Sequence, residues 1–517
     1  MVATETQPDI LALVEKLKEQ LEALSRENKI LRAENAILKQ GLFGRGRERI
    51  DPGQLALYAQ GDALAVEIEA QQDAPVAAKP KAERTGHGRA PFAPELPRET
   101  IELDLPEEER CCGSCSKALR RIGEEVTERG HVVPARIVVR RYVRPKYVCP
   151  DGHEIRTARL PDGVIDGGKY EASVYAHVVA SKYSDHLPLH RLEGIFKRRG
   201  VHLPKQTMWD MLVRVDELVA QPVLAQMRRE LLTEPVLHSD ETPVTLCLED
   251  QKGSRTGYAW GWRNLRGIGP PKVLIEFKQS RSRDGPLAFL GDWSGTLITD
   301  GYAGFDEVVR RNRIARGICW AHLRRKAKEA LDTGSKGAAR LLVPIQRLFA
   351  LERAVARRAE RDGSGFDGLV ELRRKVRERH ARRLVEAVHA QADLLRRERS
   401  TLPKSKLGRA LTFLENQREG LALFLDDPRV PIHNNDSERD LRHVAVGRKN
   451  WLVFASPRGG DVACRLYSLV LSCKQSGIDP EAYVEDLLGL VSTTPASRIA
   501  ELTPWAWAER RALAANA

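Results

Sequence analysis

Between residues 232 and 331, hydrophobic positions recur first with the period of strands and then in alternating strand and helix patterns. Three apolar segments rich in β-branched and aromatic residues, at 235–248, 257–264 and 272–278, predict three consecutive antiparallel strands. Residues 283–293 then predict a helix. Two further short apolar runs predict strands, each followed by a helix, so the region should form an α/β unit with a mixed sheet.

Three strands, helix, strand, helix, strand, helix is the order of an RNase H-like fold, in which the first strand lies beside the fourth. We therefore expect a core of this type in residues 231–339 and 426–478. Residues 340–425 show a charged helical pattern throughout and predict a helical insertion that projects as a separate lobe. Residues 479–517 predict a small helical tail.

A heptad pattern occupies the first part of the chain, residues 1–46. Its apolar d positions recur every seven residues, at Ile10, Leu17, Leu24, Leu31 and Leu38. Asn28 and Asn35 stand at a positions, where facing asparagines pair only in register. The pattern predicts a parallel dimeric coiled coil, with an amphipathic helix packed on its own domain as the alternative. Residues 47–100, which contain many proline, alanine and charged residues, predict a linker.

Four of the eight cysteines lie in residues 101–165, together with a β-rich stretch. The spacings CxxC and CxxxH suit the two halves of one tetrahedral zinc site, and the stretch between them is long enough for the hairpin of a zinc ribbon. The predicted zinc ligands are Cys112, Cys115, Cys149 and His153, with Cys111 as an alternative to its neighbour. Chance cysteines in a small β domain are the other interpretation.

Residues 166–230 predict helices. Two short amphipathic segments, 189–196 and 204–209, flank Gly200, which is typical of a helix-turn-helix, although an ordinary helical hairpin has the same pattern. Basic side chains near the turn would suit contacts to DNA phosphates. The candidates are Lys197, Arg198, Arg199 and Lys205.

The charge balance favours a polyanionic partner such as double-stranded DNA, because 84 Lys and Arg against 71 Asp and Glu leave a formal net charge of +13. No run of eighteen apolar residues occurs, and the N-terminus lacks the charged and apolar regions of a secretory signal. The cysteine usage suits metal binding in a reducing compartment. We therefore expect a cytoplasmic protein without a membrane partner.

Three acidic residues stand where a shared metal site would need them. Asp240 and Asp300 come at the ends of short apolar, β-branched runs that predict strands, and Glu438 lies at the start of a predicted helix capped by an asparagine. Carboxylate oxygens are the ligands that Mg²⁺ prefers, and two such ions about 3.5–4 Å apart commonly serve in-line attack on a phosphodiester. Glu241 should point to the opposite face of its strand and stay outside this site.

Basic residues follow Glu438 closely in the segment HNNDSERDLRHVAVGRKNW. Positive side chains beside a metal-binding acid would suit the phosphates of a DNA strand held in the same cleft. The candidates for DNA contact are Arg439, Arg442, Arg448 and Lys449.

Four motifs together resemble the bacterial insertion-sequence transposases of family sixty-six, the TnpC type: SDETPV, TDGYAGF, CWAHLRRK and HNNDSERDLRHVAVGRKNWLVFAS. The resemblance extends along almost the whole chain, from the leucine-rich coil to the tail GIDPEAYVEDLL. It implies that Asp240, Asp300 and Glu438 form a DDE catalytic triad, and that two small accessory proteins act with the transposase. One departure is that Cys149 is followed by His153, whereas many relatives carry a second cysteine pair.

The leading hypothesis is therefore a DDE transposase that binds the ends of an insertion sequence, cleaves DNA to free a 3′-hydroxyl and joins that hydroxyl to target DNA at the bacterial nucleoid. Its expected cofactors are two catalytic Mg²⁺ ions, with Mn²⁺ as a substitute, and one structural Zn²⁺. An RNase H-like nuclease would share the acids without needing a coil, a zinc domain and a helix-turn-helix. A dimeric zinc-containing DNA-binding regulator would not need the three acids.

The coiled coil leads to a test of the oligomeric state. Replacing Leu24 and Leu31 by glutamate would bury charge in the hydrophobic seam, so the variant should be monomeric where the unmodified chain is dimeric. Light scattering measures the mass of both proteins. An unchanged dimer mass would show that the subunits associate through another surface.

Overall fold

The computed structural model describes residues 137–143, 146–148, 155–157, 164, 168–247 and 253–515. The predicted coiled coil, the predicted linker and the four predicted zinc ligands Cys112, Cys115, Cys149 and His153 lie outside these residues. The chain divides into two compact units, 73–143 and the remainder, and the helices and strands described belong to the remainder. The first two strands, β1 (Lys146–Val148) and β2 (Ile155–Thr157), pair antiparallel.

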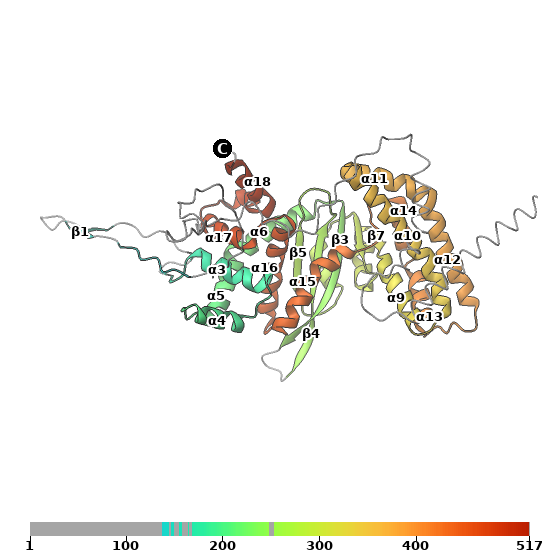
Figure 1. Cartoon of the computed structure of the whole chain (residues 1–517), viewed down its shortest axis with the longest axis horizontal. Helices are drawn as coiled ribbons and strands as arrows, with labels where there is room; N and C mark the ends of the chain where they lie inside the picture. The colour runs from blue at the N-terminus through green and yellow to red at the C-terminus, as the bar shows by residue number, and fades with distance from the viewer. Residues whose placement is uncertain are drawn as a thin grey trace, which may run out of the picture. The chain divides into compact units, whose positions relative to one another are not determined.

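A five-stranded mixed sheet organises the larger unit (Figure 1). Its strands are β3 (Val236–Cys247), β4 (Ser254–Asn264), β5 (Val273–Lys278), β6 (Thr296–Thr299) and β7 (Ala315–Ile318), in the spatial order β5-β4-β3-β6-β7. The first three strands are antiparallel to one another, whereas β6 runs parallel to β3 and β7 parallel to β6. The predicted neighbourhood of the first and fourth strands is confirmed.

Aromatic side chains fill one face of this sheet. Alternation along β4 sends Trp260 and Trp262 to the same face, where both are buried. Trp262 stacks on Phe289 of α7 (Asp284–Leu290) with ring centroids 4.1 Å apart. The helix α8 (Asp306–Asn312) packs beside α7, so these two short helices cover the tryptophan face.

The opposite face of β4 carries Gly261 and receives α15 (Asn435–Trp451) at close range. A Cβ atom added at Gly261 would lie only 3.1 Å from the Leu441 Cγ of α15. Gly261 is the register partner of Asp240 in the β3–β4 ladder. The missing side chain therefore lets α15 approach the sheet beside Asp240.

Helix α16 (Pro457–Gln475) covers the edge strand β5. The Ser468 hydroxyl accepts a hydrogen bond from the Ile275 N–H (2.7 Å), and the Ser472 hydroxyl accepts one from the Val273 N–H (3.2 Å). These two buried serines satisfy backbone groups that an edge strand otherwise exposes, so the sheet ends here.

The other helices on the α16 side of the sheet are α3 (Ala172–Val179), α4 (Leu189–Arg198), α5 (Lys205–Val215), α6 (Gln221–Leu231), α17 (Pro480–Leu490) and α18 (Pro504–Ala515).

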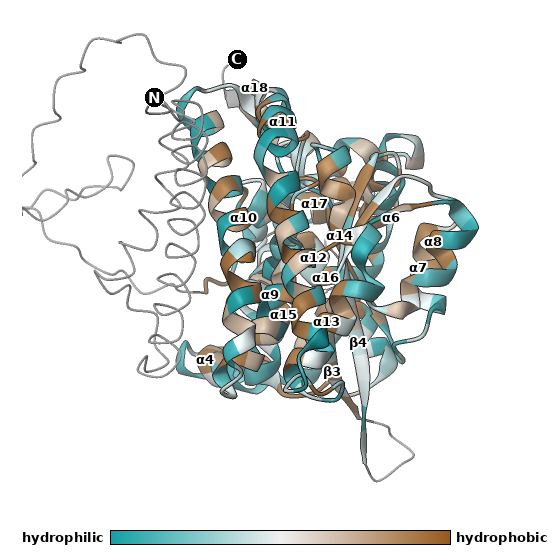
Figure 2. Ribbon diagram, turned by 90° about the vertical axis from the view of Figure 1, so that its right-hand side faces the viewer, coloured by the Kyte–Doolittle hydropathy of each residue, from teal (hydrophilic) through white to brown (hydrophobic). Residues whose placement is uncertain are grey.

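Six helices lie on the β7 side of the sheet (Figure 1). They are α9 (Trp320–Asp332), α10 (Lys336–Arg361), α11 (Gly365–Val376), α12 (Arg382–Arg397), α13 (Lys406–Asn416) and α14 (Arg418–Asp426). Hydrophobic and hydrophilic colours alternate along α10 and α12 (Figure 2), as expected of amphipathic helices. None of the described helices is long and apolar enough to cross a membrane.

The predicted helical insertion is not a separate lobe. Val236 of β3, Ile298 of β6 and Ile318 of β7 belong to the same buried hydrophobic cluster as residues of α10, α12, α13 and α14. Helix α14 also packs directly on β7. The prediction of an independent lobe is wrong because the parallel half of the sheet needs a hydrophobic cover, and these helices supply it.

A buried arginine organises the helical block. The guanidinium of Arg377, which is 1% exposed, donates two hydrogen bonds to the Glu352 carboxylate (2.7 and 2.8 Å). It also donates to the carbonyl oxygens of Phe424 (2.7 Å) and Val430 (2.9 Å). Because Val430 precedes α15 in the chain, the same side chain helps to fix the segment that leads to Glu438.

Asn434 is fully buried just before α15 and joins three segments. Its side-chain amide donates to the Ser239 carbonyl (2.8 Å), and its Oδ1 accepts from the His238 Nδ1 (2.8 Å), both on β3. Its backbone N–H donates to the Cys319 Sγ (3.1 Å) before α9. The helix begins here as expected, but the predicted asparagine cap is wrong, because the Asn434 side chain bonds to the sheet and caps no helix N–H.

Removing the Asn434 side chain should destabilise the fold. Asn434→Ala leaves the His238 Nδ1 and the Ser239 carbonyl without their partner in a buried site, so we expect a loss of about 2–4 kcal/mol in the free energy of unfolding. Urea unfolding followed by tryptophan fluorescence measures it. Asn435→Ala, at the next and half-buried position, is the matched control and should cost less than about 0.5–1 kcal/mol. Equal losses in the two variants would contradict this anchoring role.

Candidate functional site

Asp240 and Asp300 occupy matching positions on neighbouring parallel strands. His238 is the register partner of Ile298, and each acid follows two residues later on its own chain segment. Asp240 lies within β3, whereas Asp300 lies directly after β6. Parallel pairing therefore brings together two residues that are far apart in the sequence, as the strand order predicted.

Glu438 approaches the same place from the first turn of α15. Burial, together with the negative charges of Asp300, Glu241 and Glu438, raises the pKa of Asp240 to about 8. All three predicted acids are thus close enough to interact electrostatically. Without a cation between them, Asp240 is mostly protonated at neutral pH.

Local hydrogen bonds orient each acid. The Asp240 Oδ1 accepts from the Glu241 backbone N–H (3.0 Å), and the Asp300 Oδ1 accepts from the Tyr302 backbone N–H (2.8 Å) in an Asx-type turn. The Glu438 Oε2 accepts from the Arg325 Nη2 (3.2 Å) of α9. Each of the three carboxylates therefore has a support of its own, on a strand, in a turn and on a helix.

Glu241 lies on the opposite face from Asp240, beside its register partner Trp260, and is linked to Asp300 through Arg281. Its Oε1 accepts from the Arg281 Nε (2.7 Å), and the Arg281 Nη2 lies 3.7 Å from the Asp300 Oδ2. Burial and the negative charge of Asp300 raise the pKa of Glu241 to about 7, although Arg281 acts in the opposite direction. The predicted opposite face is therefore confirmed, and Arg281 nevertheless couples Glu241 to Asp300.

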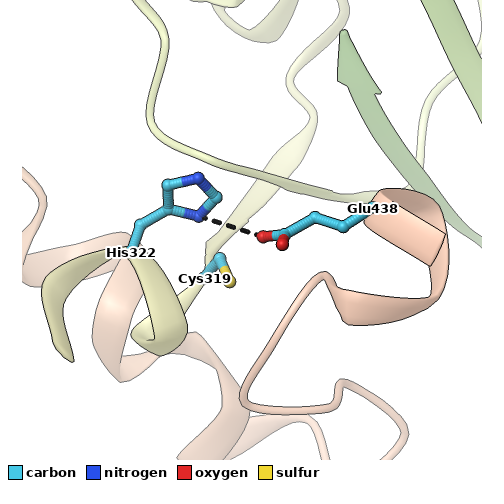
Figure 3. Close-up of side chains that lie close together, drawn as sticks. All are labelled: Cys319, His322 and Glu438. Carbon is cyan, nitrogen blue, oxygen red and sulfur yellow. Dashed lines mark ion pairs between the residues drawn. The ribbon is translucent and has the colours of Figure 1, made fainter. Parts of the chain in front are cut away.

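Cys319 and His322, for which the sequence predicts no role in the site, lie beside Glu438. One ligand atom of each residue lies within 4.8 Å of the other two (Figure 3). Burial raises the pKa of the Cys319 thiol to about 12 and lowers the pKa of His322, whereas Glu438 and Asp300 act in the opposite direction on the histidine. The CxxH spacing within CWAHLRRK is the sequence signal that could have identified this pair.

The basic residues proposed to contact DNA fall into two groups. Those near the turn between α4 and α5 are exposed: Lys197, Arg198, Arg199 and Lys205. On α15, Arg439, Arg442 and Lys449 are exposed as well, and Arg439 pairs with Asp436 (3.2 Å). Arg448 differs, because its guanidinium donates to the Thr242 Oγ1 (3.2 Å) and to the Pro243 carbonyl and so ties α15 to β3.

Family models match four successive parts of the chain. The Transposase IS66 family matches residues 167–462, and the IS66 C-terminal element matches residues 468–505. The zinc-finger binding domain of transposase IS66 matches residues 109–151, which include three of the predicted ligands but not His153. A model described as Transposase C of IS166 homeodomain matches residues 30–101, from the predicted coil into the predicted linker.

Two similar proteins come from Sinorhizobium fredii (strain NBRC 101917 / NGR234). Uncharacterized protein y4jD is 30% identical over 513 residues, which cover 95% of this chain and 97% of that protein. Uncharacterized protein y4hP is 31% identical over 444 residues, which cover 83% of this chain and 78% of that protein. With a family model over the sheet, its helical block and α15, and with a relative of nearly equal length, this chain belongs to the IS66 family of transposases.

Proposed function

We propose that the protein is a DDE transposase with an RNase H-like core, in which Asp240, Asp300 and Glu438 hold the catalytic metal ions. The observation that carries this proposal is the half-buried set of acids around Asp240, with Asp300 at the matching position of the neighbouring parallel strand and Glu438 close enough to raise the pKa of Asp240. Stability alone would not favour such a set, whereas a pair of divalent cations would neutralise it. The strand order, with three antiparallel strands followed by two parallel ones, supports the assignment of the core.

The residues present fit magnesium. Asp240, Asp300 and Glu438 offer only carboxylate oxygens, which are hard ligands of the kind that Mg²⁺ and Mn²⁺ accept. When bound, two such ions would activate the attacking oxygen and stabilise the charge that develops on the phosphate. The protein supplies the rest by fixing the three carboxylates on β3, the turn after β6 and α15.

The reaction consists of two phosphoryl transfers in the same site. In the first, a water oxygen attacks the phosphorus at the end of the element, and the bond to the 3′-oxygen breaks to leave a free 3′-hydroxyl and a 5′-phosphate. In the second, that 3′-oxygen attacks a target phosphorus, and the target strand leaves with its own 3′-hydroxyl. Exposed Arg439, Arg442 and Lys449 on α15 would hold the phosphate backbone beside the acids.

Other parts of the chain would serve recognition and assembly. We assign DNA contacts to the exposed basic residues around the turn between α4 and α5, and one structural zinc to Cys112, Cys115, Cys149 and His153. The heptad segment would join two copies of the transposase. Two small accessory proteins would assist it on DNA in the bacterial cytoplasm, at the nucleoid.

The decisive test uses purified protein, DNA carrying the ends of its element, and Mg²⁺. We expect products with a free 3′-hydroxyl and joined molecules, and Asp240→Asn should bind the DNA but lower both products by at least about 10²–10³-fold. An RNase H-like nuclease would instead cut RNA–DNA hybrids without joining, and a regulator would bind without cutting. Either outcome, or full activity in Asp240→Asn, would refute the proposal.

The same substitution should stabilise the protein in the absence of added Mg²⁺. The folded state holds the Asp240 proton up to a pKa of about 8 against an ordinary 3.8, so the free energy of unfolding falls as pH rises between these values. Asn434-anchored packing is retained in Asp240→Asn, and the amide has no proton to lose. Its melting temperature should therefore rise relative to the unmodified chain between pH 5 and pH 8, with an upper limit of about 1.4 kcal/mol per pH unit.

Glu241→Gln tests the coupling through Arg281. The amide cannot hold Arg281 as an ion pair, so the guanidinium should move toward Asp300 and compete with the metal ions there. We expect the Mg²⁺ concentration for half-maximal cleavage to rise about tenfold, equivalent to about 1.4 kcal/mol. Glu276→Gln on β5 is the control. Among the described ion pairs, Glu276 has one partner, Lys278, at 3.3 Å. An unchanged Mg²⁺ requirement in Glu241→Gln would remove Arg281 from the mechanism.

A further inference from the structure

His322 and Glu438 point toward one another from two different segments, and Cys319 lies beside them (Figure 3). Cys319 precedes the first residue of α9, His322 lies in the first turn of that helix, and Glu438 lies in the first turn of α15. Their ligand atoms, one from each side chain, all lie within 4.8 Å of one another. Among the described residues, this is the group of histidine, cysteine and acidic side chains that is compact enough to share one ion.

Two atoms in this group lack the partners that buried polar atoms normally have. The His322 Nδ1 and the Glu438 Oε1 are both buried, and neither makes a hydrogen bond within the described part of the chain. They face each other at 3.7 Å, which is too long for a hydrogen bond. Two ligands of one tetrahedral ion, each about 2.0–2.2 Å from it, lie at a similar separation.

The chemistry of the three side chains selects the class of ion. A thiolate and an imidazole are poor ligands for Mg²⁺ but good ligands for zinc and similar divalent ions, which also accept a carboxylate oxygen. The Cys319 Sγ already accepts a hydrogen bond from the Asn434 N–H (3.1 Å), and it lies at the N-terminus of α9. Both features act against the burial that raises the pKa of this thiol. A bound cation would supply the remaining stabilisation of the thiolate.

We propose that Cys319, His322 and Glu438 bind one thiophilic divalent cation, with zinc as the probe, at a site separate from the zinc-finger domain and different in chemistry from the proposed magnesium site. Three protein ligands leave a fourth position of a tetrahedral ion open to water or to a DNA oxygen. The site shares Glu438 with the proposed catalytic triad. Any effect of the bound ion on DNA cleavage therefore rests on the proposed function. Binding itself depends on the three side chains alone.

Cobalt measures this site without any DNA. The full-length protein, exchanged into Co²⁺, should show a thiolate-to-cobalt charge-transfer band, and its zinc content can be measured separately. The zinc-finger domain contributes an equal background in every variant. Cys319→Ser should bind one equivalent of metal less than the unmodified chain and lose part of the band, whereas Cys247→Ser, at a half-buried cysteine on β3, should lose neither.

His322→Gln provides the second measurement. It keeps the Cys319 thiol and removes the imidazole ligand, and His322 is only half-buried, so the fold should be retained. It should also bind one equivalent less, with an unchanged circular dichroism spectrum. Equal metal content and an equal cobalt spectrum in the unmodified chain, Cys319→Ser and His322→Gln would overturn the proposal. Asp240→Asn should keep the full cobalt signal while it loses cleavage, so a failure of this site is distinguishable from a failure of the proposed transposase mechanism.

Discussion

The placement of α15 against the sheet depends on Asn434. This residue is buried beside β3 and bonds to the Ser239 carbonyl, to His238 and to the Cys319 sulfur. Glu438 follows one helical turn later, and its backbone N–H donates to the Asn434 carbonyl (3.2 Å). Because Asn434 is bonded both to β3 and to Cys319, the first turn of α15 has little freedom to move. The position of Glu438 relative to Asp240 therefore depends on these three contacts of Asn434.

This anchoring is needed because the acids repel one another whenever all of them are ionised. Asp240, Asp300 and Glu438 share a partly buried region, where like charges interact more strongly than they do in water. Cations around the edge reduce the repulsion, with Arg281 beside Asp300 and Arg325 beside Glu438. Packing elsewhere in the fold therefore offsets the repulsion between these carboxylates. Such an arrangement is typical of a functional site.

The helical block contributes to the same end through packing. It shares one hydrophobic cluster with β3, β6 and β7, and the buried Arg377 fixes the chain at Val430 on its way to α15. On the other side, α16 covers β5 through the hydroxyls of Ser468 and Ser472. Both edges of the sheet are therefore covered by helices. Glu438 lies near Asp240 although 197 residues separate the two in the sequence.

The sequence by itself indicated the strands, the helices and the three candidate acids, because alternation and helical periodicity are local properties that neighbouring residues carry. It also predicted that β3 lies beside β6, since the order of strands and helices restricts the topology. It did not show that β3 continues past Asp240 to Cys247. Only the tertiary structure decided that Asn434 bonds to the sheet, that Arg281 joins Glu241 to Asp300, and that Cys319 and His322 meet Glu438. Such contacts join segments that are remote in the sequence, and their partners are chosen by three-dimensional packing, which no local pattern records.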